Sequence, residues 1–364
     1  MEASELIARA IRLENTPRIP TALLSGGVWT FNRKGYSLQD LLPQPETAAD
    51  LIAATNEEVG SDIVWPGSGY HNLAIRALGG AIKFRAQGAP DVQAPLLEST
   101  ADIRRIDLQR LRNDAALQSL WRVAERVVQK VGAKTLVGSS QWGPFTLAGH
   151  FYGVEKLMRS IYKDQAAVHA VLEFTTEVCL RYLEPFIEAG IGIVSVADPS
   201  ASGDLISREQ FRNFGLPYLK RVFTGLHQRG ALVSLHICGN ITNRLDLIPE
   251  TGADILSLDY KVDLGRVKEV LGGKIAFAGN MNPVGIMQNA SSAEVAAACR
   301  QCIEKAGPVP GYILMPGCDI PPGVPLANIQ AMVRTAREFR PQFVEVQKNE
   351  SSGSQGAPEA RRPA

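Results

Sequence analysis

A histidine and a cysteine stand two residues apart in the segment ALVSLHICGN, at positions 231 to 240. Side chains two apart on an extended strand point to the same face, so His236 and Cys238 are expected to lie together. Gly239 follows at once and allows the chain to turn sharply. A third soft ligand, Cys318, ends the apolar segment YILMPGC at positions 312 to 318.

One imidazole and two thiolates form a ligand set that suits zinc, and three protein ligands leave a fourth position for a substrate, as in catalytic zinc sites. Taken singly, each residue is better explained by packing, because a lone buried cysteine acts as a small hydrophobe. Their joint occurrence at two strand ends favours a metal. We therefore expect a catalytic zinc site built from His236, Cys238 and Cys318.

Other sequence features that suggest chemistry fit less well. Cys299 and Cys302 form a C-x-x-C pair inside an alanine-rich helix pattern, which indicates a packed helix face. The glycines at 67 and 69 lack the third glycine of a dinucleotide-binding loop. The remaining histidines, His71, His150, His169 and His227, are isolated along the sequence. Three tryptophans near early strand ends are suited either to line a pocket or to fill the core, and core is the preferred interpretation for each: Trp29, Trp65 and Trp142.

The elements that would position the zinc ligands alternate between strand and helix patterns. Amphipathic helix patterns cover residues 207–230 and 292–307, each opening near a serine and closing at a glycine. This alternation predicts an α/β protein, a (β/α)₈ TIM barrel with an N-terminal extension, and an open doubly wound sheet is the second choice. Eight apolar or β-branched runs read as strands: 18–24, 62–65, 135–141, 192–198, 231–238, 254–259, 274–280 and 312–318.

We expect one such barrel domain over residues 1–345. The segment 346–364 is polar, rich in Pro, Gly and Ser, and without periodicity, which predicts a disordered tail.

Further polar residues close the predicted strands and would gather with the zinc ligands on one rim of the barrel. Asp198 and Asp259 are candidate catalytic residues that would orient His236 or the substrate, although each is equally suited to capping the next helix. Asn280 closes another strand and is the candidate cofactor-binding residue.

Composition excludes some classes of function. The chain has 38 Lys and Arg against 37 Asp and Glu, a net charge of +1, which gives no indication of a nucleic-acid groove or a basic membrane-binding face. No apolar run is long enough to span a bilayer, and we expect a cytoplasmic protein. The five cysteines are few and widely spread, which favours reduced thiols over a disulfide framework.

Several segments together resemble the uroporphyrinogen decarboxylase superfamily, over nearly the whole chain except the tail. Within it they resemble the cobalamin-dependent methyltransferases that include methylcobamide:coenzyme M methyltransferase. The segments are RAIRLENTPRIP (9–20), GPFTLAGHFYG (143–153), HICGN (236–240), GADILSLDYKVDL (252–264), AGNMNPVGIM (278–287) and GYILMPGCDIPPGVPLANIQAMV (311–333).

The resemblance implies a TIM barrel and a zinc-dependent methyltransferase. Members of this branch bind zinc through H-x-C and a distant Cys, which match His236, Cys238 and Cys318. The decarboxylases are metal-free and hold their polyanionic substrate with an arginine-rich stretch. The equivalent segment here, TALLSGGVWTFNRKGY, offers only Arg33 and Lys34, so decarboxylation fits poorly, since several carboxylates require several cations.

The implied reaction moves a methyl group between a corrinoid and a thiol or another small acceptor or donor. The sequence contains no D-x-H-x-x-G segment of a corrinoid carrier, so we expect the corrinoid on a partner protein or as free cobalamin. Alternatives remain: demethylation of a methoxy, methylamine or methylthio donor, uroporphyrinogen decarboxylation, or a non-catalytic corrinoid- or zinc-binding protein. The oligomeric state is not set by the sequence.

Overall fold

The computed structural model describes residues 1–23, 27–307 and 309–341. Within them, a parallel sheet of seven strands has the order β1-β4-β5-β6-β7-β8-β9, and each strand pairs in parallel with the next. The strands of this sheet are β1 (Ile63–Val64), β4 (Leu136–Trp142), β5 (Ile193–Ala197), β6 (Leu232–Ile237), β7 (Ile255–Leu258), β8 (Ala276–Met281) and β9 (Tyr312–Pro316). A separate antiparallel pair joins β2 (Ile82–Lys83) and β3 (Asp91–Val92).

Two residues close this sheet into a barrel. Thr21 bridges to Leu314 on β9, and Ala22 bridges to Ile63 on β1, both in the parallel sense. The seven strands and this short segment therefore occupy the eight positions that the sequence predicted, and the TIM-barrel prediction is confirmed. The first predicted strand is shorter than expected because Pro20 has no N–H to donate to a neighbouring strand.

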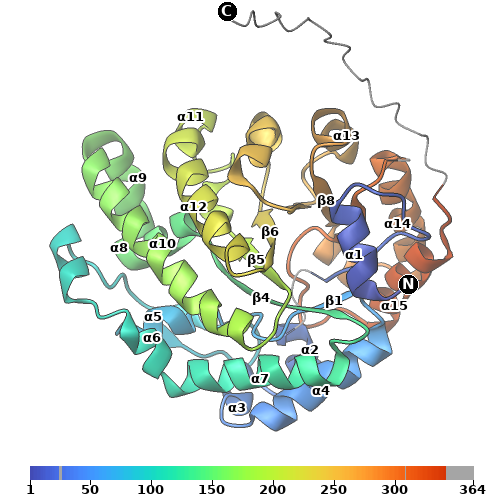
Figure 1. Ribbon diagram of the computed structural model, residues 1–364, viewed down its shortest axis with the longest axis horizontal. Coiled ribbons are helices and arrows are strands. Elements are labelled where there is room, and N and C mark those ends of the chain that lie inside the picture. The colour runs from blue at the N-terminus through green and yellow to red at the C-terminus, as the bar shows by residue number, and fades with distance from the viewer. Residues whose placement is uncertain (24–26, 308, 342–364) are drawn as a thin grey trace, which may run out of the picture.

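Helices surround the strands in a ring, and α1 lies inside that ring across one end (Figure 1). The α-helices are α1 (Ala3–Ile11), α2 (Gly27–Arg33), α3 (Leu38–Leu41), α4 (Pro45–Val59), α5 (Leu73–Ala77), α6 (Gln109–Asn113), α7 (Ala115–Val131), α8 (Pro144–Tyr152), α9 (Val154–Lys163), α10 (Gln165–Glu188), α11 (Arg208–Gln210), α12 (Leu216–His227), α13 (Leu264–Leu271), α14 (Ser292–Ala306) and α15 (Leu326–Glu338). The 3₁₀ turns are η1 (Thr100–Arg105), η2 (Pro199–Ala201) and η4 (Thr242–Thr251), and the π turns are η3 (Phe211–Gly215) and η5 (Pro283–Gln288).

The helix predicted over residues 207–230 is interrupted. It begins at a capping box in which Ser207 and Gln210 bond each other's backbone, passes through the π turn η3, and continues as α12. Pro217 at the start of α12 lacks an N–H, so the regular i to i−4 pattern cannot run through this point. The second predicted helix, 292–307, is confirmed as α14, capped by Ser291 and ending at Gly307.

The interior of the barrel is apolar near the strand starts and more polar near the strand ends. Isoleucines near the strand starts line a small cavity together with Ser234. One row of paired positions runs across the upper level, through Trp142, Ala197, His236 and Ser257 on four successive strands. The seven strands of the sheet contain no Lys or Arg.

The N-terminal end of the barrel, which we call the floor, is closed by α1. Ile7 and Ala10 pack with the inward-facing residues Ile63, Ile193 and Ile313. This helix is the N-terminal extension that the sequence predicted, and it leaves the opposite end of the barrel as the mouth.

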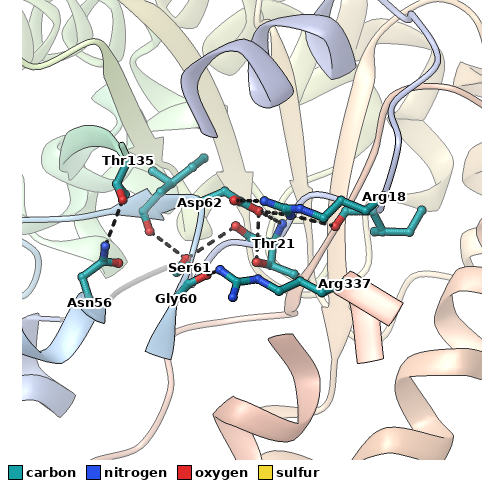
Figure 2. Close-up of polar contacts among 10 residues, drawn as sticks. Arg18, Thr21, Asn56, Gly60, Ser61, Asp62, Thr135 and Arg337 are labelled. Carbon is teal, nitrogen blue, oxygen red and sulfur yellow. Dashed lines mark hydrogen bonds and ion pairs between the residues drawn. The ribbon is translucent and has the colours of Figure 1, made fainter. Parts of the chain in front are cut away.

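A polar network surrounds the floor (Figure 2). Arg18 donates two hydrogen bonds to Asp62, Nη1 to Oδ2 at 2.7 Å and Nη2 to Oδ1 at 2.6 Å. The backbone N–H of Thr21 also donates to Asp62 Oδ2, at 2.8 Å. Arg337 of the last helix donates to the carbonyl of Gly60 at 2.7 Å. The network therefore joins the first strand segment, β1 and the C-terminal helix at one end of the barrel.

None of the helices in the described part of the chain combines the length and the apolar character that a bilayer crossing demands. The tail predicted for residues 346–364 lies outside the described residues, as does Leu24 of the first predicted strand.

Candidate metal centre at the barrel mouth

The end of β6 carries two of the three predicted zinc ligands. His236 is a strand residue, only 2% exposed, and Cys238 follows one residue past the strand end. Their alternation on the strand places both side chains on the inner face, so His236 Nε2 lies 3.0 Å from Cys238 Sγ. Sequence spacing alone predicted this proximity.

The third predicted ligand reaches the same point from β9. Cys238 Sγ and Cys318 Sγ lie 3.4 Å apart, and the three ligand atoms lie within 4.8 Å of one another. Gly317 makes this approach possible, because a Cβ at that position would lie 2.5 Å from the backbone N of Tyr260. A larger residue before Cys318 would therefore push this segment away from the end of β7.

Gly239 is required for a similar reason. Its φ of +79° is in the left-handed region, and a Cβ there would lie 2.4 Å from Asp204 Oδ2 and 2.5 Å from Ser202 Oγ. The sharp turn expected after Cys238 is thus present, and it directs the chain away from the mouth directly after the ligand pair.

The three side chains fit a zinc ion by their chemistry and spacing. Zinc takes sulfur at about 2.3 Å and imidazole nitrogen at about 2.0 Å, so tetrahedral ligand atoms lie roughly 3.5 to 3.8 Å apart, close to the separations here. The hydrogen bond between the two thiols lowers the pKa of Cys318 and raises that of Cys238, because one thiol donates to the sulfur of the other. One sulfur is thereby prepared to act as a thiolate ligand.

A serine hydroxyl contacts the ring of His236. Its Nδ1 lies 2.9 Å from Ser257 Oγ, on the neighbouring strand β7 at the paired position. This contact directs Nε2 toward the sulfurs. The sequence analysis missed Ser257, although a polar residue inside an apolar strand, two positions before Asp259, was an available signal.

Asp198 lies beside β6, and its carboxylate accepts hydrogen bonds from the first turn of α8. Its backbone N–H donates to the carbonyl of His236 at 2.8 Å. Its carboxylate accepts from the N–H and the hydroxyl of Thr146, both at 2.7 Å, and from the N–H of Phe145 at 3.3 Å. Burial raises the pKa of Asp198 to about 6, even though these hydrogen bonds oppose the rise. The observed contacts are those of a cap on α8, and a role in orienting His236 or the substrate stays a prediction.

Asp259 and Asn280 support the loop that carries the ligands. Asp259 accepts from the N–H of Gly239 at 2.8 Å and from that of Lys261 at 2.9 Å. The side-chain amide of Asn280 donates to the carbonyls of Asp259 and Val262, at 3.0 and 2.6 Å. Asp259 therefore fixes the turn just after Cys238, and Asn280 fixes Asp259. Direct contact of Asn280 with a cofactor stays a prediction.

Two of the histidines described above as isolated are close to each other in the structure. The rings of His71 and Trp142 have centroids 4.6 Å apart, and those of Trp142 and His150 are 6.0 Å apart. All three side chains are half-buried, and Trp142 also packs against the hydrophobic core. Histidines that are isolated along the sequence thus share one aromatic neighbour in space. The loop after β1 folds back over the end of β4, which no local pattern indicated.

The remaining expectations agree with the structure. Cys299 is buried and Cys302 half-buried on α14, as a packed helix face requires. His169 contacts Tyr218 OH at 2.7 Å, and His227 contacts Asp254 at 2.9 Å. Arg33 and Lys34, the two cations of the segment discussed for decarboxylation, both pair with Glu58.

Comparison with known proteins places this site in context. The model of the family described as uroporphyrinogen decarboxylase (URO-D) matches residues 2–339. A methylcobamide:CoM methyltransferase of Methanosarcina acetivorans is 29% identical over 238 residues, 64% of this chain and 68% of the relative. A uroporphyrinogen decarboxylase of Carboxydothermus hydrogenoformans is 27% identical over 356 residues, 92% of this chain and 97% of the relative.

A solved methyltransferase structure from Methanosarcina mazei superposes with a TM-score of 0.83 at 24% identity, and the match covers 93% of this chain and 99% of that one. This likeness supports the barrel fold. Relatives of both activities share the fold, so the choice between them depends on the residues at the mouth.

Proposed function

Because the chain belongs to the uroporphyrinogen decarboxylase family, we propose that within it the protein is a zinc-dependent methyltransferase that acts between a corrinoid and a small thiol. The observation that carries the proposal is the convergence of His236 Nε2, Cys238 Sγ and Cys318 Sγ within 4.8 Å at the barrel mouth. The printed activity of the methylcobamide:CoM relatives supports the same class of reaction.

A zinc ion held by these three side chains would supply the charge that keeps a substrate thiol deprotonated at neutral pH. The protein's own residues prepare the place for it. Ser257 fixes the ring of His236, and Asp259 fixes the turn after Cys238. In the transfer, the substrate sulfur would bond the methyl carbon as the cobalt–carbon bond broke. The corrinoid would keep both electrons of that bond, and the thiol proton would be released.

Decarboxylation of a polyanionic substrate is less well supported. The strands of the barrel carry no Lys or Arg, and Arg33 and Lys34 are paired with Glu58. Several substrate carboxylates would have no cationic partner among these residues, and that would leave buried charges unpaired. The reverse direction of methyl transfer, from a methylated donor to cobalt(I), uses the same residues and belongs to the same proposal.

The corrinoid would arrive on a partner protein or as free cobalamin. Three large apolar side chains are exposed on loops that follow strands at the mouth: Leu205 after β5, Tyr260 after β7 and Val284 after β8, which are 55%, 45% and 49% exposed. Exposed apolar residues on loops at the same end of the barrel as the three ligand candidates are suited to a transient protein contact. We propose that this rim is where a corrinoid protein docks.

The test combines metal analysis with a cobalamin assay. Purified protein is expected to hold about one zinc per chain and to convert methylcobalamin to the cobalt(I) spectrum with a suitable thiol. Cys238→Ala is expected to lose the zinc and to lower methyl transfer by at least about a hundredfold. Cys299→Ala, in the packed face of α14, is the matched control and should keep both. Full zinc content and full activity in Cys238→Ala would refute the assignment.

A further inference from the structure

Three rings form a wall on the side of the mouth away from the cysteines. We call His71, Trp142 and His150 the rim wall. Trp142 lies between the two imidazoles, with centroid distances of 4.6 Å to His71 and 6.0 Å to His150. Each ring is half-buried, so part of its surface remains accessible.

The rim wall is held by hydrogen bonds that fix the rings without using their faces. The indole N–H of Trp142 donates to Asn72 Oδ1 at 2.8 Å, and Asn72 in turn donates to the carbonyl of Pro90. His71 Nε2 lies 2.7 Å from Ser140 Oγ, on the inner face of β4. Gln141 bonds the backbone of both His71 and Trp142. These bonds engage ring nitrogens, side-chain amides and the backbone, so the ring orientations are fixed while no hydrogen bond occupies a ring face.

The rim wall lies at the same level as the metal ligands. Trp142 on β4 pairs with Ala197 on β5, and Ala197 pairs with His236 on β6. Trp142 and His236 lie two strands apart in the sheet, so their backbones are about 10 Å apart, measured across the strands. The residue between them in this row, Ala197, carries only a methyl group. A short molecule with its sulfur at the metal ligands would therefore place its other end against the rim wall.

The electrostatics of this space favour a positive charge. Burial lowers the pKa of His71 to about 4 and also lowers the pKa of His150, so both imidazoles are neutral at pH 7. Asp198 and Asp259 are buried close to this row, and the strands that form it contribute no Lys or Arg. Indole and neutral imidazole faces attract cations through their π electrons, with Trp the strongest.

We propose that the rim wall binds a cationic group of the substrate, an ammonium or trimethylammonium carried on a short linker from the thiol. This inference rests on the proposed methyl transfer and names its substrate class. An anionic thiol such as a sulfonate would meet ring faces and find no Lys or Arg on these strands to pair with it, so it would be the poorest member of a matched series.

A series of thiols with the same two-carbon linker tests the proposal. It comprises 2-aminoethanethiol, its N,N,N-trimethyl form, 2-mercaptoethanol and 2-mercaptoethanesulfonate. With zinc-loaded protein and methylcobalamin, the trimethylammonium thiol is expected to exceed the sulfonate by at least about tenfold in kcat/KM. Trp142→Leu should reduce that ratio to within about threefold, and Trp142→Phe, which keeps a ring face, should retain most of it. A sulfonate preference, or an unchanged ratio in Trp142→Leu, overturns the proposal.

A binding measurement without thiol separates this proposal from the methyl-transfer proposal. Tetramethylammonium is expected to quench tryptophan fluorescence in zinc-loaded and zinc-free protein alike. Trp142→Leu should abolish the quenching, and Trp121→Leu, on α7 away from the mouth, should preserve it. If tetramethylammonium binds in this way but no thiol is methylated, the rim wall stands and the proposed function fails. If thiols are methylated but tetramethylammonium does not bind, the proposed function stands and the rim wall fails.

Discussion

The two ends of the barrel use their polar side chains in opposite ways. At the floor, Asp62 has both oxygens engaged by Arg18 and a further bond from Thr21, and α1 covers the opening beside them. At the mouth, His236, Cys238 and Cys318 turn their ligand atoms toward one another. The floor uses strong charge pairs to join distant segments, and the mouth gathers soft, weakly bonded atoms at one point.

The difference between the two ends indicates which of them is suited to bind a ligand. A saturated charge pair has no capacity left for a ligand, however well it is placed, so Asp62 is a structural residue. Thiols held by weak contacts to each other and to an imidazole can exchange those contacts for metal bonds. In barrels of this kind, chemistry at the strand C-termini and stability at the N-termini follow the same division.

The largest expected effect is a loss of stability caused by a substitution at the floor. Asp62→Ala leaves Arg18 partly buried without its partner, since the two side chains are 22% and 3% exposed. We expect the free energy of unfolding in urea to fall by about 3 kcal/mol, while zinc content per folded molecule stays unchanged. Arg85→Ala, which removes the exposed pair with Asp91, is the control and should cost less than about 1 kcal/mol. Equal losses in the two variants would show that the floor pair is not special.

The next effect concerns pH and the mouth. The pKa of Asp198 is raised by burial to about 6, above its unfolded value of about 3.9. The protonated carboxyl is thus favoured in the folded state, so its contribution to stability is full below pH 4 and is lost as the pH rises through 6. Wild type should lose about 2 kcal/mol relative to Asp198→Asn between pH 4 and pH 7. Urea unfolding of both proteins over this range measures it, and a pH-independent difference would contradict it.

The smallest expected effect concerns the orientation of His236, one of the proposed metal ligands. Ser257→Ala removes the partner of His236 Nδ1 without touching a ligand atom. We expect zinc affinity to fall about tenfold to a hundredfold in a chelator competition, with little change in unfolding. The matched control is Ser234→Ala. Ser234 lies on the inner face of β6, two residues before His236. An affinity equal to wild type would mean that the backbone alone orients the imidazole.

The sequence was sufficient for the barrel and for the convergence of His236, Cys238 and Cys318, because both follow short-range rules. Apolar runs of strand length, separated by capped helices, specify the order of elements. The spacing of His236 and Cys238 places them on one face, and parallel strands bring Cys318 to the same rim.

The partners that the sequence did not provide depend on how loops return over strand ends. His71 reaches Trp142 and Ser140 only because the segment after β1 folds back over β4. Ser257 gives no sign of its bond to His236 until the register of β6 and β7 is known. The bond between Arg18 and Asp62 likewise requires the closed barrel. Such contacts depend on tertiary geometry, so local patterns do not encode them.

Closure of the barrel through Thr21 and Ala22 also determines how late in synthesis the barrel can form. Thr21 pairs with Leu314, and the indole of Trp29 donates to the carbonyl of Val324 at 2.8 Å. Partners so far apart along the chain cannot meet until almost all of the described residues have left the ribosome. At about 5 to 20 residues per second, the N-terminal segment waits on the order of tens of seconds for its partner strand. During that interval the edge of the first segment that will pair with β9 is unpaired, which makes the nascent chain a natural client for chaperones that shield strand edges.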